Sequence, residues 1–288
     1  MSGKAISVII VSYRSGDVID GCLRSIREQN DLGDELEVIL VEQSPEEDLY
    51  RYLTAEYPEV TVIRAENRGF GAGNNLGAAQ AQGEILFFLN PDTVVESPVF
   101  AFIRDQFAQD PRMGLAGVRL LSPEGEQISW NMRFPYGLAN KLKYVLYRRM
   151  DRFDSRQMYI EGADLIIRGE AFRKAGGFDE KIFMYGEELD ICERIRRAGY
   201  TIRYFPERTI RHLQGKCTDD RYPAVYGKQL DAFLYDSAKH GFDARKWLRR
   251  EYRYQTFLAP AMKLAGNKSR AELAKELKGI VKEKLGKI

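Results

Sequence analysis

Two acidic stretches carry the side chains best suited to chemistry. The apolar run LFFLN ends in NPD at residues 90 to 92, and YGEELD places Glu187, Glu188 and Asp190 at the start of a predicted helix. A carboxylate such as Asp92 at a strand end can ligate Mg²⁺ or Mn²⁺, which prefer oxygen donors. A carboxylate that follows aromatic and glycine residues can lie in a cleft and act as a general base. The alternatives are an ordinary acidic turn and simple helix capping, because a helix N-terminus favours negative charge.

Two further segments could contribute to a site. His212, one of only two histidines, follows the last predicted strand in RTIRHLQG, where a loop histidine without function is the alternative. Gly69, Gly71 and Gly73 lie between a predicted strand and a helix, which allows close backbone approach to a ligand and turns a helix N-terminus toward a phosphate. Their spacing differs from the dinucleotide fingerprint, and they follow the third strand rather than the first. The pattern therefore argues against a dehydrogenase.

The first third of the chain alternates strand and helix patterns. Continuous apolar strands separated by helices predict a parallel sheet covered on both faces. Ligands of such sheets gather at the carboxyl ends of the strands. Ser12, Glu42, Asn67 and Asp92 would all lie at that edge. The strands are predicted at residues 5–13, 36–44, 60–65 and 84–90.

The rest of the chain continues the mixed pattern and then becomes helical and basic. An amphipathic basic helix or loop at 140–153 is expected between the two halves of the sheet, and a soft break is expected near residues 214 to 222. The other predicted elements are a helix at 97–112, a strand with a turn at 114–128, a strand entering a helix at 159–177, a loop and helix at 178–200, and a last strand at 201–207.

Composition indicates a globular protein with an uneven charge. The chain has 288 residues, 44% hydrophobic and 30% charged, with a net charge of +2. From Lys239 to the end there are 14 basic and five acidic residues, so this tail carries +9 and the remainder −7. A basic tail suits an anionic membrane face, although a solvated helix surface explains it equally well. Three scattered cysteines and the lack of a long apolar run predict a cytoplasmic protein in a reducing compartment.

In this order, these segments resemble the family 2 nucleotide-sugar glycosyltransferases. The stretches that carry the likeness are SVIIVSYRSGDVIDGCLRSI, NRGFGAGNNLGAAQAQGEILFFLNPDTVV, EGADLIIRGEAFRKAGGFDEKIFMYGEELDICERIRRAGY and the histidine of RHLQG, spread over roughly residues 5 to 215. The resemblance implies an α/β fold of the GT-A type, a Rossmann-like, mostly parallel sheet flanked by helices, with a C-terminal helical extension. It implies a glycosyltransferase domain at 1–215, with a nucleotide-binding half at 1–96 and an acceptor and catalytic half at 97–215, and a basic helical extension at 216–288.

The resemblance also implies roles for individual residues. NPD stands where the family has an Asp-x-Asp metal motif, so Asp92 would bind Mg²⁺ or Mn²⁺ with His212 as the late histidine. Glu187 and Glu188 stand where the family has a Glu-Asp pair, so Glu188 would be the catalytic base, with Glu187 and Asp190 as alternatives. The implied nucleotide-sugar contacts are Ser12, Tyr13, Glu42, Asn67, Gly69, Asn74, Asn90, Gly162, Ala163 and Asp164.

Two departures from the family pattern concern specificity and catalysis. VEQSPEED replaces the usual Val-Asp-Asn-x-Ser at Glu42, which leaves the nucleobase open between UDP- and dTDP-sugars. Glu at position 188 replaces an Asp and lengthens the reach of the base by one methylene.

The implied activity is inverting transfer of a sugar, with dTDP-rhamnose as the favoured donor, to a glycan or lipid-linked acceptor of bacterial surface polysaccharide synthesis. The basic tail, with Trp247, Tyr252, Tyr254 and Phe257, would meet the inner membrane face beside that acceptor. Transfer to a soluble acceptor is the alternative within this class, and a non-catalytic glycan-binding module or a nucleotidyltransferase are those outside it. The near-zero net charge and acidic body argue against nucleic-acid binding.

Overall fold

The protein forms two compact units. The computed structural model describes residues 3–213 and 222–288, so Cys217 and most of the predicted break near 214 to 222 lie outside the described residues. The first unit contains residues 3–131 and 158–213, and the second contains Met132–Gln157 and 222–288. Residues 132–157, which lie inside the sequence range predicted for the sheet domain, therefore belong with the C-terminal helices.

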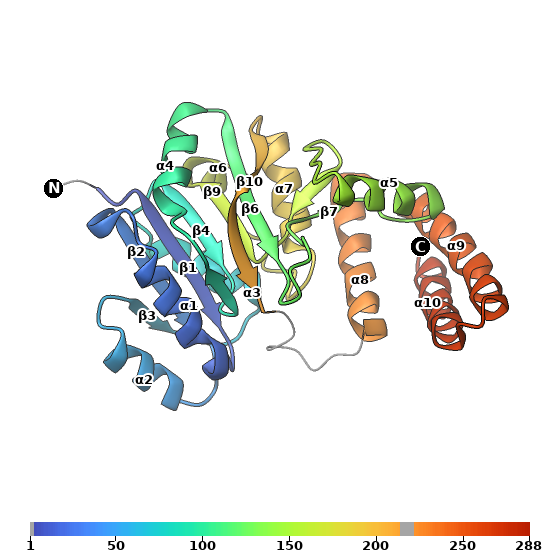
Figure 1. The fold of residues 1–288 in the computed structure, drawn as a ribbon, viewed down its shortest axis with the longest axis horizontal. Coiled ribbons are helices and arrows are strands. Elements are labelled where there is room, and N and C mark those ends of the chain that lie inside the picture. Colours follow the sequence, from blue (N-terminus) through green and yellow to red (C-terminus); the bar gives the residue numbers. More distant parts are fainter. Residues whose placement is uncertain (1–2, 214–221) are drawn as a thin grey trace. The chain divides into compact units, whose positions relative to one another are not determined.

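The first unit is built on an eight-stranded sheet in the order β3-β2-β1-β4-β9-β6-β10-β5 (Figure 1). Six strands are parallel, whereas β9 runs antiparallel between β4 and β6 and β5 runs antiparallel beside β10. The strands are β1 (Ile6–Ser12), β2 (Leu36–Glu42), β3 (Thr61–Arg64), β4 (Ile85–Leu89), β5 (Thr93–Val95), β6 (Met113–Leu121), β9 (Asp164–Arg168) and β10 (Thr201–His212).

Helices cover both faces of this sheet, as the continuous apolar strands predict (Figure 1). Phe87 and Phe88 are neighbours on β4 and point to opposite faces. Phe87 meets Phe100 of α4, and Phe88 packs with Phe172 of α6 and with Phe178. Alternation of side chains along a strand therefore gives each face its own aromatic core. The helices are α1 (Gly16–Glu28), α2 (Asp48–Glu56), α3 (Phe70–Gln80), α4 (Phe100–Gln109), α6 (Gly169–Ala175) and α7 (Glu187–Arg197), with a short 3₁₀ turn at Gly33–Glu35.

The predicted fold class and most of the predicted elements are confirmed. The exception that matters for the site is the last strand, which was expected to end at residue 207 with His212 in a following loop. β10 instead continues to His212, because a register shift between Phe205 and Thr209 lets the strand resume pairing with β6 and then with β5. His212 is thus fixed by a sheet rather than by a loop.

Helix α3 lies unusually close to the sheet because it is rich in small residues. A Cβ added at Gly77 would lie 2.5 Å from Cγ2 of Ile9 and 3.4 Å from Cγ2 of Val41. Ile9 and Val41 are fully buried on β1 and β2, so neither has room to move. Glycine at this position therefore sets the distance between α3 and the strands beneath it.

The second unit is helical and has its own aromatic core. Trp247 stacks on Phe134 with ring centroids 4.6 Å apart, and Tyr136 meets Phe233 edge-on. Trp247, predicted from sequence to face a membrane, is therefore part of the packing of this unit. The elements are α5 (Leu138–Arg149), α8 (Tyr222–His240), α9 (Ala244–Leu264) and α10 (Lys268–Gly286), and the chain enters and leaves through the two-stranded ribbon of β7 (Trp130–Met132) and β8 (Met158–Ile160).

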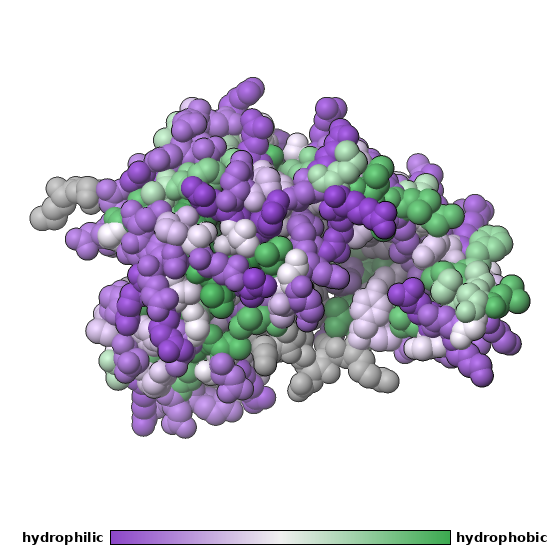
Figure 2. All heavy atoms as spheres, in the orientation of Figure 1, coloured by the Kyte–Doolittle hydropathy of each residue, from purple (hydrophilic) through white to green (hydrophobic). Residues whose placement is uncertain are grey.

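Helix α5 differs from the other helices of this unit because none of its residues is buried. Leu138, Leu142, Val145 and Leu146 on the helix and Met150 directly after it are each at least half exposed. Figure 2 shows hydrophobic residues at the surface in the region where Figure 1 draws α5. Within residues 3–213 and 222–288, no helix is both long and apolar enough to span a bilayer.

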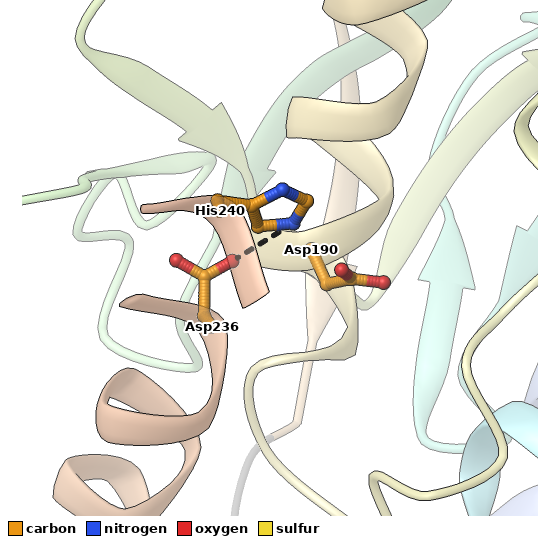
Figure 3. Close-up of side chains that lie close together, drawn as sticks. All are labelled: Asp190, Asp236 and His240. Carbon is orange, nitrogen blue, oxygen red and sulfur yellow. Dashed lines mark ion pairs between the residues drawn. The ribbon is translucent and has the colours of Figure 1, made fainter. Parts of the chain in front are cut away.

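A buried ion pair joins the segment after β7 to α8. Arg133 Nη1 donates to Asp236 at 2.7 Å, and both side chains are almost completely buried. His240 lies one turn further along α8, with Nε2 3.6 Å from the Asp236 carboxylate (Figure 3). Asp190, drawn in the same figure, belongs to α7 of the first unit, where its carboxylate pairs with Arg194 at 2.6 Å.

The packing of α3 predicts opposite effects for two helical glycines. Gly77→Ala should destabilise the protein by ~1–3 kcal/mol, because the methyl group overpacks against Ile9. Gly21→Ala, in α1 with no atom within 4 Å of its added Cβ, should be neutral or stabilising by up to ~1 kcal/mol. Urea unfolding of both variants measures the difference. Equal stability of the two variants would show that α3 can move away from the sheet without cost.

Candidate active site

A pocket of about 280 Å³ opens at the carboxyl edge of the sheet in the first unit. Its walls come from the ends of β1, β2 and β4, the segment before β9, the turn before α7, and the end of β10. The sequence-predicted residues that line it are Tyr13, Asn67, Asn90, Asp92, Gly162, Ala163, Glu187, Glu188 and His212. Parallel strands thus deliver distant polar residues to one edge, as the sequence indicates.

Asp92 and His212 meet at the base of this pocket although 120 residues separate them. Nε2 of His212 lies 3.1 Å from Oδ1 of Asp92, and the Asp92 residue is only 5% exposed. Antiparallel pairing of β5 with β10 places His212 opposite Thr93, and the amide of Leu213 donates to the Asp92 carbonyl at 2.8 Å. Backbone hydrogen bonds on both sides therefore fix the pair.

Asn90 completes this group from the end of β4. Its Nδ2 is 3.5 Å from Nε2 of His212, and its amide donates to the Ala163 carbonyl at 3.1 Å. The buried Oδ1 of Asn90 and Nδ1 of His212 have no hydrogen-bond partner among the described residues. A carboxylate, an imidazole and an amide oxygen are suitable ligands for Mn²⁺ or Mg²⁺. The residues present therefore fit a divalent cation held mainly by Asp92 and His212.

A strained turn presents the two glutamates to the pocket. Tyr185 and Gly186 both have left-handed backbones, with φ of 71° and 94°, immediately before α7 begins at Glu187. The positive φ of Tyr185 is unfavourable for a residue with a side chain and marks a conformation that the surroundings impose. Glu188 Oε2 accepts the amide of Gly186 at 3.2 Å, which holds the carboxylate back toward the pocket.

Burial raises the pKa of both glutamates. Glu187 is buried, and one of its oxygens, Oε2, has no hydrogen-bond partner among the described residues. Desolvation is the main cause of the raised pKa of Glu187, and the nearby Glu161 adds to it. The pKa of Glu188 is raised by desolvation first and then by the charges of Glu187 and Glu161. A half-buried carboxylate that lines a pocket and holds its proton more tightly than usual is suited to proton transfer.

Several predicted site residues lie behind the pocket wall rather than in it. Asp190 is buried against Arg194, as an ion pair within α7. Glu42 is fully buried and accepts the amide of Ser44 at 2.7 Å. Asp164 accepts the amide of Val118 at 2.8 Å, and burial raises the pKa of its carboxyl group well above the usual value. Ser12, at the end of β1, is also fully buried.

The glycine-rich turn serves the protein's own packing. A Cβ at Gly69 would lie 2.5 Å from the carbonyl oxygen of Phe183, and the residue has φ of 101°, so only glycine fits. The amide of Phe70 donates to that same carbonyl at 3.1 Å. Asn74 is buried and donates to the Phe70 carbonyl at 3.0 Å. The turn therefore supports the loop before α7, and neither Gly69 nor Asn74 is among the residues that line the pocket.

Some lining residues were not predicted from the sequence. Glu161 enters beside Gly162, with Oε2 accepting from Asn131 at 2.6 Å. Gln43 reaches the pocket next to the buried Glu42, as strand alternation requires. Alternation implies that only one of these two neighbours faces the pocket, and the register of β2 against β1 decides that it is Gln43. Glu161 had no sequence signal beyond its place before Gly162. The remaining unpredicted lining residues are Val11, Ser15, Phe70, Pro91, Met184 and Tyr185.

Two known proteins are similar to this chain in sequence. The chain is 25% identical over 260 residues to the N-acetylglucosaminyl-diphospho-decaprenol L-rhamnosyltransferase of Mycobacterium tuberculosis, a match that covers 80% of this chain and 83% of the relative. It is 24% identical over 216 residues to the rhamnosyltransferase WbbL of Escherichia coli, covering 69% and 80%.

A solved structure shares the fold. The mannosyltransferase PcManGT from Pyrobaculum calidifontis, in complex with GDP-Man and Mn²⁺, superposes with a TM-score of 0.66 at 16% identity, over 100% of this chain and 87% of that one. The model of glycosyl transferase family 2 matches residues 7–174, more than half of the chain. With its GT-A sheet and the pocket at the carboxyl edge of that sheet, the chain belongs to glycosyl transferase family 2.

Proposed function

We propose that this glycosyltransferase transfers a sugar to a hydroxyl of a lipid-linked or glycan acceptor with inversion of the anomeric centre. The favoured donor is dTDP-rhamnose rather than a UDP-sugar. The observation that carries the proposal is one pocket lined by two chemically distinct pairs of side chains, Asp92 with His212 and Glu187 with Glu188. The two rhamnosyltransferase relatives support the choice of sugar. A role in bacterial surface polysaccharide synthesis at the inner membrane face is part of this proposal. The diphospho-decaprenol in the name of the mycobacterial relative supports its lipid-linked acceptor.

The two pairs of side chains have different roles in the proposed reaction. Glu188 accepts the proton of the acceptor hydroxyl as that oxygen attacks the anomeric carbon and the nucleoside diphosphate leaves from the opposite face. Asp92 and His212 would hold a divalent cation, which when bound neutralises charge on the leaving diphosphate. Burial raises the pKa of Glu188, and the negative charge of Glu187 adds to this effect. Tyr13, Asn67 and Gln43 also line the pocket and would bind the nucleotide in this proposal.

Donor turnover tests the proposal directly. The protein, with Mn²⁺ or Mg²⁺ and a panel of nucleotide sugars, should release nucleoside diphosphate from dTDP-rhamnose faster when a lipid-linked acceptor is added. Release of pyrophosphate would indicate a nucleotidyltransferase, and binding without release would indicate a sugar-nucleotide-binding module. Either result would overturn the proposed reaction.

The base assignment predicts a large and selective loss of rate. Glu188→Gln should lower kcat about 10²- to 10⁴-fold, the usual contribution of general base catalysis, with little change in donor affinity. Asp190→Asn is the matched control, because its carboxylate faces Arg194 and not the pocket. Single-turnover transfer and donor titration measure both variants, once thermal unfolding shows that they are folded. A Glu188→Gln enzyme with full activity would remove Glu188 from the mechanism.

The raised pKa of Glu188 predicts a particular pH profile. Because the base acts only when ionised, kcat/KM should rise with pH through a pKa above that of an ordinary glutamate. Glu187→Gln removes a neighbouring negative charge, lowers the pKa of Glu188, and should move the acidic limb of the profile to lower pH.

The same substitution should also change stability with a defined sign. The folded-state pKa of Glu187 lies above the unfolded value, so the wild type loses stability as pH rises through that range, whereas Gln does not. The variant should therefore be more stable than wild type at pH 8 and equal to it near pH 4. If the acidic limb of the kcat/KM profile of Glu187→Gln stays in place or moves to higher pH, the proposed coupling between Glu187 and Glu188 is contradicted.

The metal assignment predicts the effect of two substitutions on Mn²⁺ affinity. Asp92→Asn and His212→Ala should each weaken Mn²⁺ binding in the presence of dTDP by about tenfold or more, since loss of even an indirect metal partner costs 10- to 100-fold. His240→Gln, at the other histidine, should leave the affinity unchanged. Electron paramagnetic resonance of free Mn²⁺ gives the binding constants. If all three variants bind Mn²⁺ as tightly as the wild type does, the cation is bound elsewhere.

A further inference from the structure

Helix α5 has the opposite polarity to an ordinary surface helix. Its polar contacts point into the second unit: the amide of Gly137, just before the helix, donates to Glu251 at 3.1 Å, and Lys141 lies 3.2 Å from the same carboxylate. Glu251 is fully buried on α9, so these contacts hold the helix from its inner side. A surface helix of a globular protein normally turns its apolar side inward instead.

The apolar side of α5 faces outward as a continuous stripe. We call it the α5 stripe; its members are Leu138, Leu142, Val145, Leu146 and Met150, which are 60%, 62%, 50%, 54% and 59% exposed. Their spacing of three and four residues places them on one side of the helix. Single exposed apolar residues are normal on protein surfaces, but five that adjoin one another indicate a binding surface.

Charge decides what kind of partner this surface suits. Within Leu138–Arg149 there are four basic residues and no acidic one. Arg149 is exposed beside the stripe, and the guanidinium of Arg152, in the turn after the helix, lies 5.2 Å from the ring centre of Tyr147. An apolar stripe flanked by cations and tyrosines matches a bilayer interface with anionic headgroups. A second copy of the same surface would instead bring like charges together.

We propose that the α5 stripe inserts into the surface of an anionic phospholipid bilayer, with the helix parallel to the membrane plane. Leucine and methionine side chains enter the acyl boundary, while Arg149 and its basic neighbours contact lipid phosphates. This refines the membrane role first assigned to the basic tail, because Trp247 is used in packing and α5 offers the larger apolar surface. The lipid-linked acceptor gives the inference its purpose, but lipid binding by α5 does not depend on the identity of the donor.

Vesicle flotation tests the inference without any sugar acceptor. The full chain should float with vesicles of phosphatidylcholine and phosphatidylglycerol at 3:1, and much less with phosphatidylcholine alone. The double substitution Leu142→Glu/Leu146→Glu should lower the vesicle-bound fraction about tenfold or more. Leu264→Glu, at the exposed end of α9, is the matched control and should stay within about twofold of wild type.

Four results would overturn the proposal. The first two are absence of wild-type flotation with the anionic vesicles and wild-type flotation of the double variant. The third is an equal loss with Leu264→Glu, which would move the anchor to α9. The fourth is a wild-type dimer that the double variant converts to a monomer, which would assign the stripe to a subunit interface. Thermal unfolding and release of nucleoside diphosphate in detergent-free buffer show that each variant is folded, and failure of donor turnover in the wild type would concern the proposed reaction alone.

Discussion

The reversed strand β9 is the constraint on which the pocket depends. Because β9 runs antiparallel between β4 and β6, its first residue, Asp164, pairs with Leu89 at the end of β4. The segment before it, with Glu161 and Gly162, therefore lies at the carboxyl edge where the parallel strands end. An all-parallel sheet would place that segment at the opposite edge. The hydrogen bond from the Asn90 amide to the Ala163 carbonyl joins the two strands at this point.

Two carboxyl groups are buried at this edge of the sheet. Asp164 accepts a hydrogen bond from the amide of Val118, and Glu187 is buried in the lining of the pocket. Burial raises the pKa of both carboxyl groups, because a charged carboxylate loses its hydration there. Asp92 has a direct partner in the pocket, because Nε2 of His212 lies 3.1 Å from its carboxylate. The sheet therefore brings two different pairs of side chains, Asp92 with His212 and Glu187 with Glu188, to one pocket.

Much of this arrangement could be predicted from local sequence patterns. Apolar runs located β1, β2 and β4, and the polar residues that end them located the edge of the site. Sequence alone could not show that the strand ending at His212 resumes after a register shift, because pairing with β5 decides it. Nor could it distinguish Glu42 from Gln43, since which neighbour faces the pocket depends on the register of β2 against β1. Sequence also does not reveal that the glycine-rich turn approaches the Phe183 carbonyl, so it could not show the internal packing role of Gly69.

Helix α5 shows the same limit in a sharper form. Periodicity identifies an apolar stripe on residues 138–150, but it cannot tell whether the stripe faces the core or the solvent. The orientation depends on Glu251, about a hundred residues later in the chain. Its buried carboxylate accepts hydrogen bonds from Gly137, Gln255 and Tyr226 and forms an ion pair with Lys141. Lys141 of α5 supplies the positive charge beside this buried carboxylate, which accounts for the polar side of the helix facing inward. Its apolar side is then left at the surface, where folding gains little from it, and a partner outside the chain is the remaining reason for its sequence.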